Sequence, residues 1–474
     1  MEFALEILSY VFWVIVAIMI LVFVHEMGHY AFAKLFKMRV DRFSIGFPPK
    51  IVGKKIGNTE YVIGATPLGG YVKIAGMVDE SMDTDFLQSQ PQPWEFRAKP
   101  VWQRMIVITA GVIFNMLLAW VVFASLKFAH GEDYVPAENI SGVYVQEGSI
   151  AHQMGMRTGD RPIAAAGRPL VRKSDLDGVE ALMADPMTIT VVRDGQEMTL
   201  RGPSDIMTQL NRRGFSLGIS ADPPLISAVQ EDSPAAEAGL RPGDRVLALA
   251  SDTVRFWAEM TDRIQALEGA PVRVRWARPD SLVSELGEIT TSAAELVGQR
   301  GGVHIYEAEI EPTYHEATES YLLGLMGPSS EMIAREFGQQ HRSFSIGGAI
   351  TAGFSETWMN SRAIVTSLKR IVTGRENVRE NLGGPVMIAK VTKEAAEAGG
   401  SVFWRIVALL SITLAIMNIL PIPALDGGHL VFLIYEGITR REPSVRVRMV
   451  MQQIGMFLIL ILMTFLIFND ILKL

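Results

Sequence analysis

The residues with the clearest chemical meaning lie near the start of the chain, where residues 24–29 read Val-His-Glu-Met-Gly-His. This is the HExxH pattern. On a helix, side chains at positions i and i+4 lie on one face, so His25 and His29 can bind one metal ion together. Glu26 lies beside them and can polarise a water molecule on that metal. Because the chain has eight histidines, we expect a chance match in roughly one such sequence in a hundred, and the pattern needs support from its surroundings.

The alternative is a pair of buried histidines that make only structural hydrogen bonds. The preceding residues disfavour it, because residues 7–24 are almost entirely apolar. Histidine and glutamate at the edge of a membrane span are costly and are functional by default. The chain has no cysteine, so a metal here must be bound by His, Asp or Glu. A catalytic zinc usually has three protein ligands and one open position, and a third ligand is therefore required.

This third ligand must come from a distant part of the chain. In metzincins it is a histidine six residues after the second one, with a glycine between them. Leu35 and Phe32 occupy those two positions here, which excludes that class. The best candidate is Asp426, which begins the run Asp-Gly-Gly-His. His429 remains a competing ligand, although the two glycines make a regular helical i, i+3 pairing with Asp426 uncertain.

The residues before Asp426 predict a broken helix. They read Asn-Ile-Leu-Pro-Ile-Pro from Asn418 to Pro423, and proline interrupts a helix. A broken helix inside a membrane is tolerated only where it lines a cavity or is buried in protein. For Asn418, a hydrogen bond that packs two helices together is the alternative to a role in the site.

The elements that must position these residues are predicted to span a membrane. Apolar residues make up 49% of the chain and mean hydropathy is +0.23, which is high for a soluble protein of this length. A bilayer requires about 20 consecutive apolar residues. Four stretches approach this length: about 7–24, 105–128, 402–420 and 449–468.

The positions of the basic residues predict how these spans are oriented. Residues 30–104 contain 11 Lys and Arg against 7 Asp and Glu, and the short loop after the third span carries four arginines. Basic loops face the cytoplasm, so both termini and the segment 129–311 are predicted to lie outside. Spans one and three then run in the same direction. His25, His29 and Asp426 are therefore expected at the same depth, near the cytoplasmic side.

The long segment 129–311 contains an internal repeat. Residues 149–163 align with residues 233–247, and seven of the 15 positions are identical. Each copy has a glycine turn, at Gly155 or Gly239, followed by Gly-Asp and a β-like run. This pattern resembles bacterial PDZ domains, which bind an extended peptide as an added strand. Spacer domains without a ligand are the alternative.

Residues 312–400 are predicted to form an amphipathic helical region that lies along the membrane surface. Phe354, Trp358, Val365, Leu368 and Val372 fall near helical spacing. Packing of this helix on the external domains is the alternative. Residues 313–345 are predicted to be helical.

Several motifs together resemble the site-2 protease family of intramembrane metalloproteases, and the likeness covers nearly the whole chain. The first span carries HExxH, and the second carries Gly111-Val-Ile-Phe-Asn115. The third carries Asn-x-x-Pro-x-Pro-x-Leu-Asp-Gly, which ends at Gly427. The runs 67–73, 96–104 and 381–385 agree with the same family.

The resemblance implies roles for individual residues. His25, His29 and Asp426 would bind Zn²⁺, and Glu26 would act as the general base. A β-loop within residues 60–76 would enter the membrane and pair with the substrate as a strand. The residues that would contact the substrate are Asn418, Pro421, Pro423, Leu68, Gly69, Gly70 and Tyr71.

The resemblance also implies regulated intramembrane proteolysis in a bacterial inner membrane. The expected substrates are transmembrane segments of single-span proteins that have already been trimmed, such as anti-sigma factors and remnant signal peptides. The PDZ-like pair would act as a size filter or contact a peptide. Membrane lipid is an expected partner, whereas a net charge of −7 argues against nucleic acid. The alternatives are a non-catalytic PDZ scaffold that senses stress and a zinc transporter, although spans two and four lack ligands before their ends.

The fold class is therefore predicted as a multi-pass helical membrane protein with four transmembrane helices and two inserted, external PDZ-like α+β domains. The predicted parts are a first transmembrane helix (1–36), a cytoplasmic and re-entrant β-loop region (37–104), a second helix (105–128), two PDZ-like domains (129–221 and 222–311), the amphipathic region (312–400), a third helix (401–436), a cytoplasmic loop (437–448) and a fourth helix (449–474).

Overall fold

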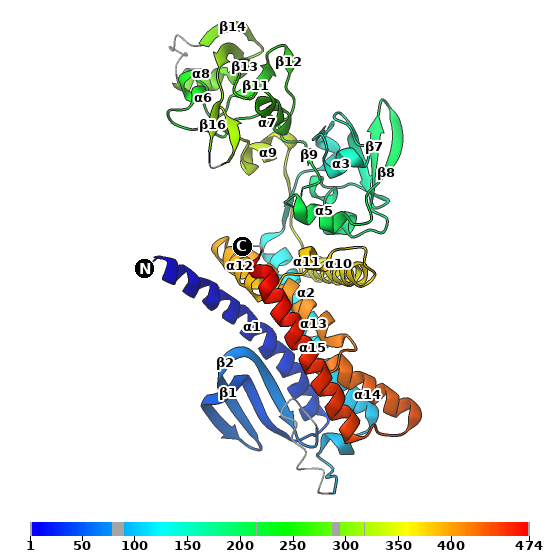
Figure 1. Cartoon of the computed structure of the whole chain (residues 1–474). Coiled ribbons are helices and arrows are strands. Elements are labelled where there is room, and N and C mark those ends of the chain that lie inside the picture. The colour runs from blue at the N-terminus through cyan, green and yellow to red at the C-terminus, as the bar shows by residue number, and fades with distance from the viewer. Residues whose placement is uncertain (1, 78–89, 215, 287–293, 317, 473–474) are drawn as a thin grey trace. The chain divides into compact units, whose positions relative to one another are not determined.

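The computed structural model describes residues 2–77, 90–214, 216–286, 294–316 and 318–472 (Figure 1). Contacts divide the chain into two compact units. The first unit combines Met1–Gly131 with Ser343–Leu474, and the second is Glu132–Arg342.

The first unit is mainly helical. Among the described residues, four of its helices are long and apolar enough to cross a membrane: Leu8–Leu35 within α1, and the whole of α2, α13 and α15. These helices confirm the four predicted spans. The helices of this unit are α1 (Glu2–Leu35), α2 (Val101–His130), α10 (Ile346–Val372), α11 (Val378–Asn381), α12 (Pro385–Glu397), α13 (Gly400–Ile419), α14 (Asp426–Thr439) and α15 (Val445–Ile471).

Helix α2 is the centre of this unit, because α1, α10 and α13 all pack against it. Small residues permit the close approach. A Cβ atom on Gly28 of α1 would collide with the backbone of Ala110 in α2, and one on Gly353 of α10 would lie 2.5 Å from the nitrogen of Ala124. Helices in lipid associate through such small residues because burial of apolar surface from water does not drive them together.

The part predicted as the third helix, residues 401–436, is two helices. The α-helix α13 ends at Ile419, and α14 begins at Asp426. The connecting residues contain Pro421 and Pro423, and Ala424 has a positive φ of 76°. The predicted break is confirmed, and it places Asp426 in the first turn of a new helix.

A bent β-hairpin follows α1. It consists of β1 (Val40–Ile56) and β2 (Thr59–Ile74). Both strands fold back on themselves, so that Arg42 of β1 pairs with Lys73 and also with Glu60. Gly46 has a positive φ of 88°, a conformation that glycine adopts at no steric cost. The bend brings the end of β2 against α1, where Val72 and Ile74 join the buried cluster around Ala33.

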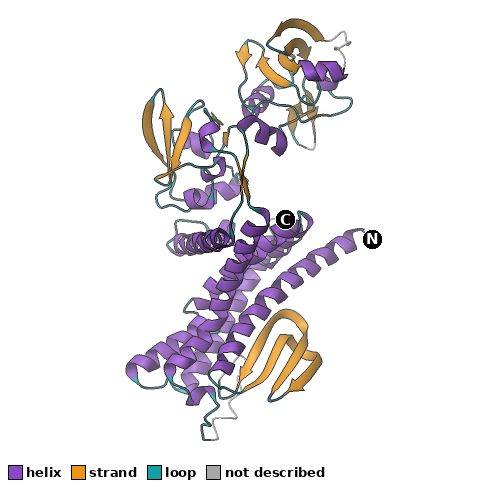
Figure 2. Cartoon of the chain, turned by 180° about the vertical axis from the view of Figure 1, so that it is seen from behind, coloured by secondary structure: helices purple, strands orange, loops and turns teal. Residues whose placement is uncertain are grey.

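The second unit contains two copies of one arrangement of strands. Figure 2 shows the strands in orange and the helices in purple. The first copy has strand order β6-β5-β7-β8 and the second has β12-β11-β13-β15-β14. A two-residue ladder joins β4 to β9 in the first copy and β10 to β18 in the second. The strands are β3 (Glu132–Tyr134), β4 (Tyr144–Val145), β5 (Arg161–Ala165), β6 (Arg168–Pro169), β7 (Thr188–Arg193), β8 (Gln196–Arg201), β9 (Ile219–Ser220), β10 (Ala228–Val229), β11 (Arg245–Leu249), β12 (Asp252–Thr253), β13 (Val272–Pro279), β14 (Ala294–Arg300), β15 (Val303–Ile310), β16 (Thr313–His315), β17 (Ser320–Leu322), β18 (Leu325–Met326) and β19 (Gln340–Arg342).

Short helices complete each copy. They are α3 (Ile150–Gln153), α4 (Val179–Leu182), α5 (Ile206–Arg212), α6 (Pro234–Glu237), α7 (Trp257–Ala266), α8 (Asp280–Leu286) and α9 (Ser330–Phe337).

In both copies, an arginine binds the aspartate of the repeated Gly-Asp pair. In the second copy, Arg278 donates from Nε and Nη2 to the two carboxylate oxygens of Asp244, at 2.8 and 2.7 Å, and from Nη2 to the carbonyl of Gly239 at 2.8 Å. In the first copy, Arg193 binds Asp160 in the same bidentate way. The structural repeat thus extends well beyond the aligned residues.

The prediction that residues 313–345 are helical is wrong. The described part of this segment contains four short strands, β16–β19, and one helix, α9. The second copy also continues past residue 311, because β18 pairs with β10. These strands have two or three residues each, which is too short for a period-two pattern to appear in the sequence.

The amphipathic helix predicted after this segment is α10. Phe354, Trp358, Val365 and Val372 are exposed along it, whereas Leu368 packs against the cluster that α2 and α13 form. Four of the five residues predicted for the apolar face are therefore exposed together, whereas Leu368 points toward the interior of the unit.

Because the side chains of Asp244 and Arg278 are 0% and 2% exposed, Arg278→Met should leave a buried carboxylate without its counter-ion. We expect this variant to destabilise the second copy by about 3–5 kcal/mol. Pulse proteolysis of the full chain in urea measures the change. The control is Arg335→Met, which removes an ion pair whose side chains are 80% and 74% exposed and should cost less than about 1 kcal/mol. Equal costs for the two variants would contradict the prediction.

Candidate metal centre

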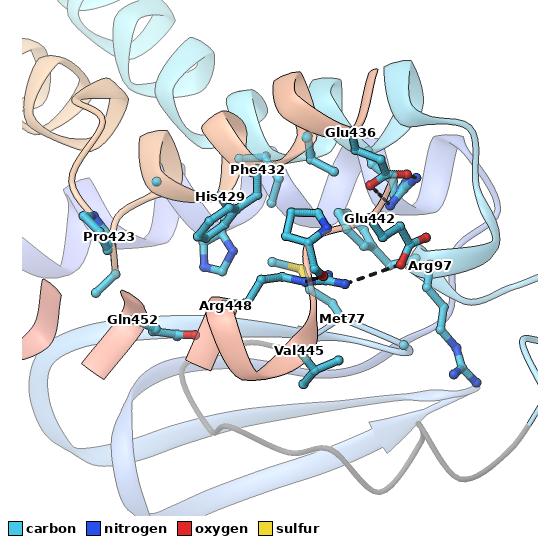
Figure 3. Close-up of a pocket in the computed structure, with 18 residues that line it drawn as sticks. Met77, Arg97, Pro423, His429, Phe432, Glu436, Glu442, Val445, Arg448 and Gln452 are labelled. Carbon is cyan, nitrogen blue, oxygen red and sulfur yellow. Dashed lines mark hydrogen bonds and ion pairs between the residues drawn. The ribbon is translucent and has the colours of Figure 1, made fainter. Parts of the chain in front are cut away.

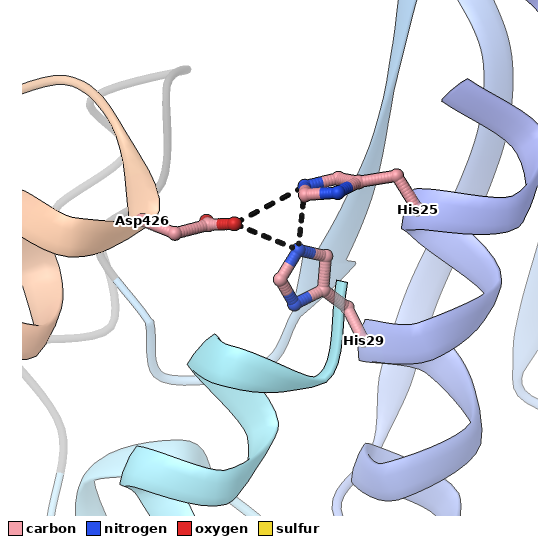
Figure 4. Close-up of side chains that lie close together, drawn as sticks. All are labelled: His25, His29 and Asp426. Carbon is pink, nitrogen blue, oxygen red and sulfur yellow. Dashed lines mark hydrogen bonds and ion pairs between the residues drawn. The ribbon is translucent and has the colours of Figure 1, made fainter. Parts of the chain in front are cut away.

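Three side chains from two distant helices meet in the first unit (Figure 4). Asp426 Oδ2 lies 3.1 Å from His25 Nε2 and 3.5 Å from His29 Nε2, and the two Nε2 atoms are 3.2 Å apart. One ligand atom of each residue lies within 4.8 Å of the others. Asp426 Oδ2 is buried and makes no hydrogen bond of acceptable geometry with any described residue. Two imidazole nitrogens and a carboxylate oxygen form a donor set that zinc prefers, so the residues fit a divalent metal.

Two helices, α1 and α14, hold the three ligand candidates. His25 and His29 are one turn apart on α1 and are 7% and 9% exposed. Asp426 is the first residue of α14, where the break after α13 turns the chain toward α1. A carboxylate at this position is also favoured by the partial positive charge of a helix N-terminus.

The other ring nitrogens of the two histidines face α2. His29 Nδ1 lies 2.8 Å from the carbonyl oxygen of Val107, and His25 Nδ1 lies 3.4 Å from the side-chain amide of Asn115. If Nε2 faces a metal, Nδ1 carries the proton and needs an acceptor. Asn115 Oδ1 is buried and has no hydrogen-bond partner among the described residues. Turning this amide by 180° gives the His25 Nδ1–H that acceptor.

Glycine allows α2 to approach the imidazoles. A Cβ atom on Gly111 would lie 2.5 Å from His25 Cε1 and 2.6 Å from His29 Nε2. Gly111 and Asn115 are one helical turn apart, so they occupy the same face of α2. In the sequence both residues stood out only as part of a family motif. Their i, i+4 spacing places them on one helix face, but it does not show that this face is turned toward the histidines.

A cavity of about 520 Å³ adjoins the three side chains. Glu26 and Val72 both line it. Asn418 also lines it, with Nδ2 3.2 Å from His25 Nε2. The end of β2, including Gly69, Gly70 and Tyr71, also lines it. The structure therefore brings these predicted residues together around one cavity.

The remaining predicted residues lie elsewhere. Pro421 is exposed and is not among the described residues that line this cavity. Pro423 lines a smaller neighbouring cavity of about 80 Å³ (Figure 3). The side chain of Leu68 is outside the described part of the structure.

His429 lies on the walls of both cavities, but within the described ranges it is not in the group of three side chains whose ligand atoms meet. The smaller cavity is also lined by the part-buried ion pair of Arg104 with Glu436, in which Nη1 and Oε2 are 3.1 Å apart. The geometry of the described residues thus favours Asp426 over His429 as the third ligand candidate.

The close contact at Gly111 can be tested by substitution. Gly111→Ala should push the two imidazoles apart and lower zinc retention about 10–100-fold, as loss of the support around a metal site typically does. Gly347→Ala, in the first turn of α10, is the matched control because its added Cβ meets no atom of the described residues within 4 Å. Metal analysis of the two purified variants after dialysis against a chelator measures the difference. Equal zinc contents would contradict the described contact.

Comparison with known proteins agrees with this geometry. The model of peptidase family M50 matches residues 13–462. The chain is 31% identical to the regulator of sigma-E protease RseP of Escherichia coli K12 over 477 residues, which cover 96% of this chain and 97% of that protein. It is 30% identical to RseP of Salmonella typhimurium strain 14028s over the same shares, and 30% identical to a candidate zinc metalloprotease of Xylella fastidiosa strain Temecula1 over 98% of this chain and 99% of that one. The chain therefore belongs to peptidase family M50, the site-2 proteases, which are membrane zinc metalloendopeptidases.

Proposed function

We propose that this chain cleaves transmembrane segments of single-span proteins after a first protease has trimmed them. His25, His29 and Asp426 would hold the zinc, and Glu26 would be the general base. The observation that carries this proposal is the meeting of three ligand atoms from α1 and α14 within 4.8 Å of one another.

Zinc, when bound, supplies a Lewis acid that polarises the scissile carbonyl and lowers the pKa of water. Glu26 takes the proton from the attacking water and later delivers it to the leaving amine. Glu26 lines the same cavity as His25, His29 and Asp426, so its carboxylate can reach that water.

Asn418 is the residue of α13 whose side-chain amide lines the cavity, and it lies beside His25. An amide both donates and accepts hydrogen bonds, so it can bind the N–H and C=O groups of an unwound peptide. This position suits Asn418 to hold the substrate backbone next to the scissile bond.

The end of β2 supports the proposed mode of substrate binding. Residues 70–74 pair on one side with residues 40–45 of β1, and residues 69–74 line the cavity. A helical substrate hides its carbonyls in internal hydrogen bonds, whereas a substrate that pairs as a strand exposes them to attack. A transmembrane segment would therefore unwind locally and add to this strand.

The proposed setting is a bacterial inner membrane. The basic loops support an orientation with the metal centre near the cytoplasmic side and with both termini and the second unit outside. We also propose that the two copies of the repeat are PDZ-like domains that exclude untrimmed substrates or contact a peptide. The names of the RseP relatives refer to sigma-E regulation, which supports an anti-sigma factor as one substrate. Remnant signal peptides are a second proposed substrate.

We also propose that α10 contacts the membrane surface. The apolar residues exposed along this helix support that contact.

Replacement of the general base tests the chemistry. Glu26→Gln should retain zinc, because the ligand candidates are unchanged, but it should lose cleavage of a tagged single-span substrate by at least about 100-fold. Immunoblotting of the substrate in cells and metal analysis of the purified variant measure the two effects. Substantial cleavage by this variant would remove Glu26 from the proposed role.

Replacement of the carboxylate tests the ligand set. Asp426→Asn should weaken zinc retention, because a neutral amide is a poorer ligand than a carboxylate. Competition with a chelator measures the affinity, and His429→Asn is the matched control, which should keep zinc. Unchanged zinc affinity in Asp426→Asn together with loss in His429→Asn would assign the third position to His429.

A further inference from the structure

A groove in the second copy of the repeat lies between helix α7 and the strands β17 and β18. It has a volume of about 390 Å³. Its lining is mostly apolar and includes Val229, Trp257, Met260, Ile264, Leu323 and Leu325. The metal centre lies in the other unit, so this groove is a separate feature of the chain.

One edge of β17 faces this groove. On the other edge β17 pairs with β16, where Thr313 lies opposite Leu322 and His315 lies opposite Ser320. Successive residues of a strand direct their backbone hydrogen-bonding groups to alternate edges. The N–H and C=O of Tyr321 are therefore directed toward α7.

The side chain of Gln265 occupies both of these backbone groups. Its Oε1 accepts from the N–H of Tyr321 at 2.9 Å, and its Nε2 donates to the carbonyl of Tyr321 at 2.6 Å. Two residues that face each other in an antiparallel ladder exchange the same pair of hydrogen bonds. The amide of Gln265 thus takes the place that one residue of an added strand would occupy.

We infer that Gln265 closes this groove against an extended peptide. A peptide with apolar side chains at alternate positions binds there, with one residue paired to Tyr321, once the amide has moved away. The alternate side chains then lie against the partly exposed apolar residues of the lining, which are Val229, Trp257 and Leu325. This inference rests on the proposal that the second copy contacts a peptide, and it is independent of the metal chemistry.

The groove offers a matched control residue. Thr261 also lines it, but its Oγ1 donates to the carbonyl of Ala258 within α7, at 2.9 Å. Substitution of Thr261 changes the groove wall without freeing the edge of β17.

The test uses the full chain in detergent micelles and a fluorescein-labelled decapeptide of alternating valine and lysine. Gln265→Ala should bind this probe about tenfold more tightly than the unsubstituted chain, because the peptide no longer displaces two hydrogen bonds. Thr261→Val should bind it as the unsubstituted chain does. Hydrogen exchange of the Tyr321 amide should be faster in Gln265→Ala than in either of the other two proteins.

Equal probe affinity and equal Tyr321 exchange in Gln265→Ala and the unsubstituted chain would overturn the inference. Gln265→Glu is a second variant in case the alanine variant misfolds. Its carboxylate cannot donate to the Tyr321 carbonyl, so it should also bind the probe more tightly, and failure to do so would overturn the inference as well. Cleavage of a single-span substrate, measured alongside, reports separately on the proposed function.

Discussion

A carboxylate beside two imidazoles, buried between apolar helices, is the constraint on which the first unit depends. Removing an ionised carboxylate from water costs several kcal/mol unless an opposite charge compensates it. Asp426 Oδ2 is buried without an acceptable hydrogen bond to any residue that the structure describes, and it faces nitrogens that are themselves metal ligands in many proteins. A bound cation would resolve this conflict, since it would be coordinated by the same three donors. Without a cation, burial of this carboxylate would destabilise the fold, whereas with zinc the same three donors would stabilise the bound ion.

The rest of the first unit supports that meeting of donors. Gly28 and Gly111 let α1 and α2 approach until the imidazoles reach Val107 and Asn115. The prolines after α13 end one helix so that Asp426 can begin another. The bent hairpin then places the end of β2 on the wall of the cavity, where the proposed substrate would pair with it as a strand. The contact between α1 and α2, the break between α13 and α14, and the end of β2 thus all position residues around one cavity.

Local patterns made the meeting of His25, His29 and Asp426 predictable from the sequence. HExxH places two donors on one helix face, and span length together with basic loops predicted that Asp426 lies at their depth. The contact of Asn115 with His25 was not predictable, because it depends on how α2 is rotated. The strands β16–β18 were missed because each is too short to show a pattern and because β10, the partner of β18, is almost one hundred residues away in the chain. Nothing in the sequence singled out Gln265, because its contact with Tyr321 depends on which edge of β17 is left without a partner strand by β16.

The most direct measurement of the central claim is anomalous diffraction at the zinc edge from crystals of the full, zinc-loaded chain. One peak is predicted within about 2.0–2.2 Å of Nε2 of His25, Nε2 of His29 and a carboxylate oxygen of Asp426. A peak bound to other residues, or one coordinated by both histidines with Asp426 turned away, would contradict the claim.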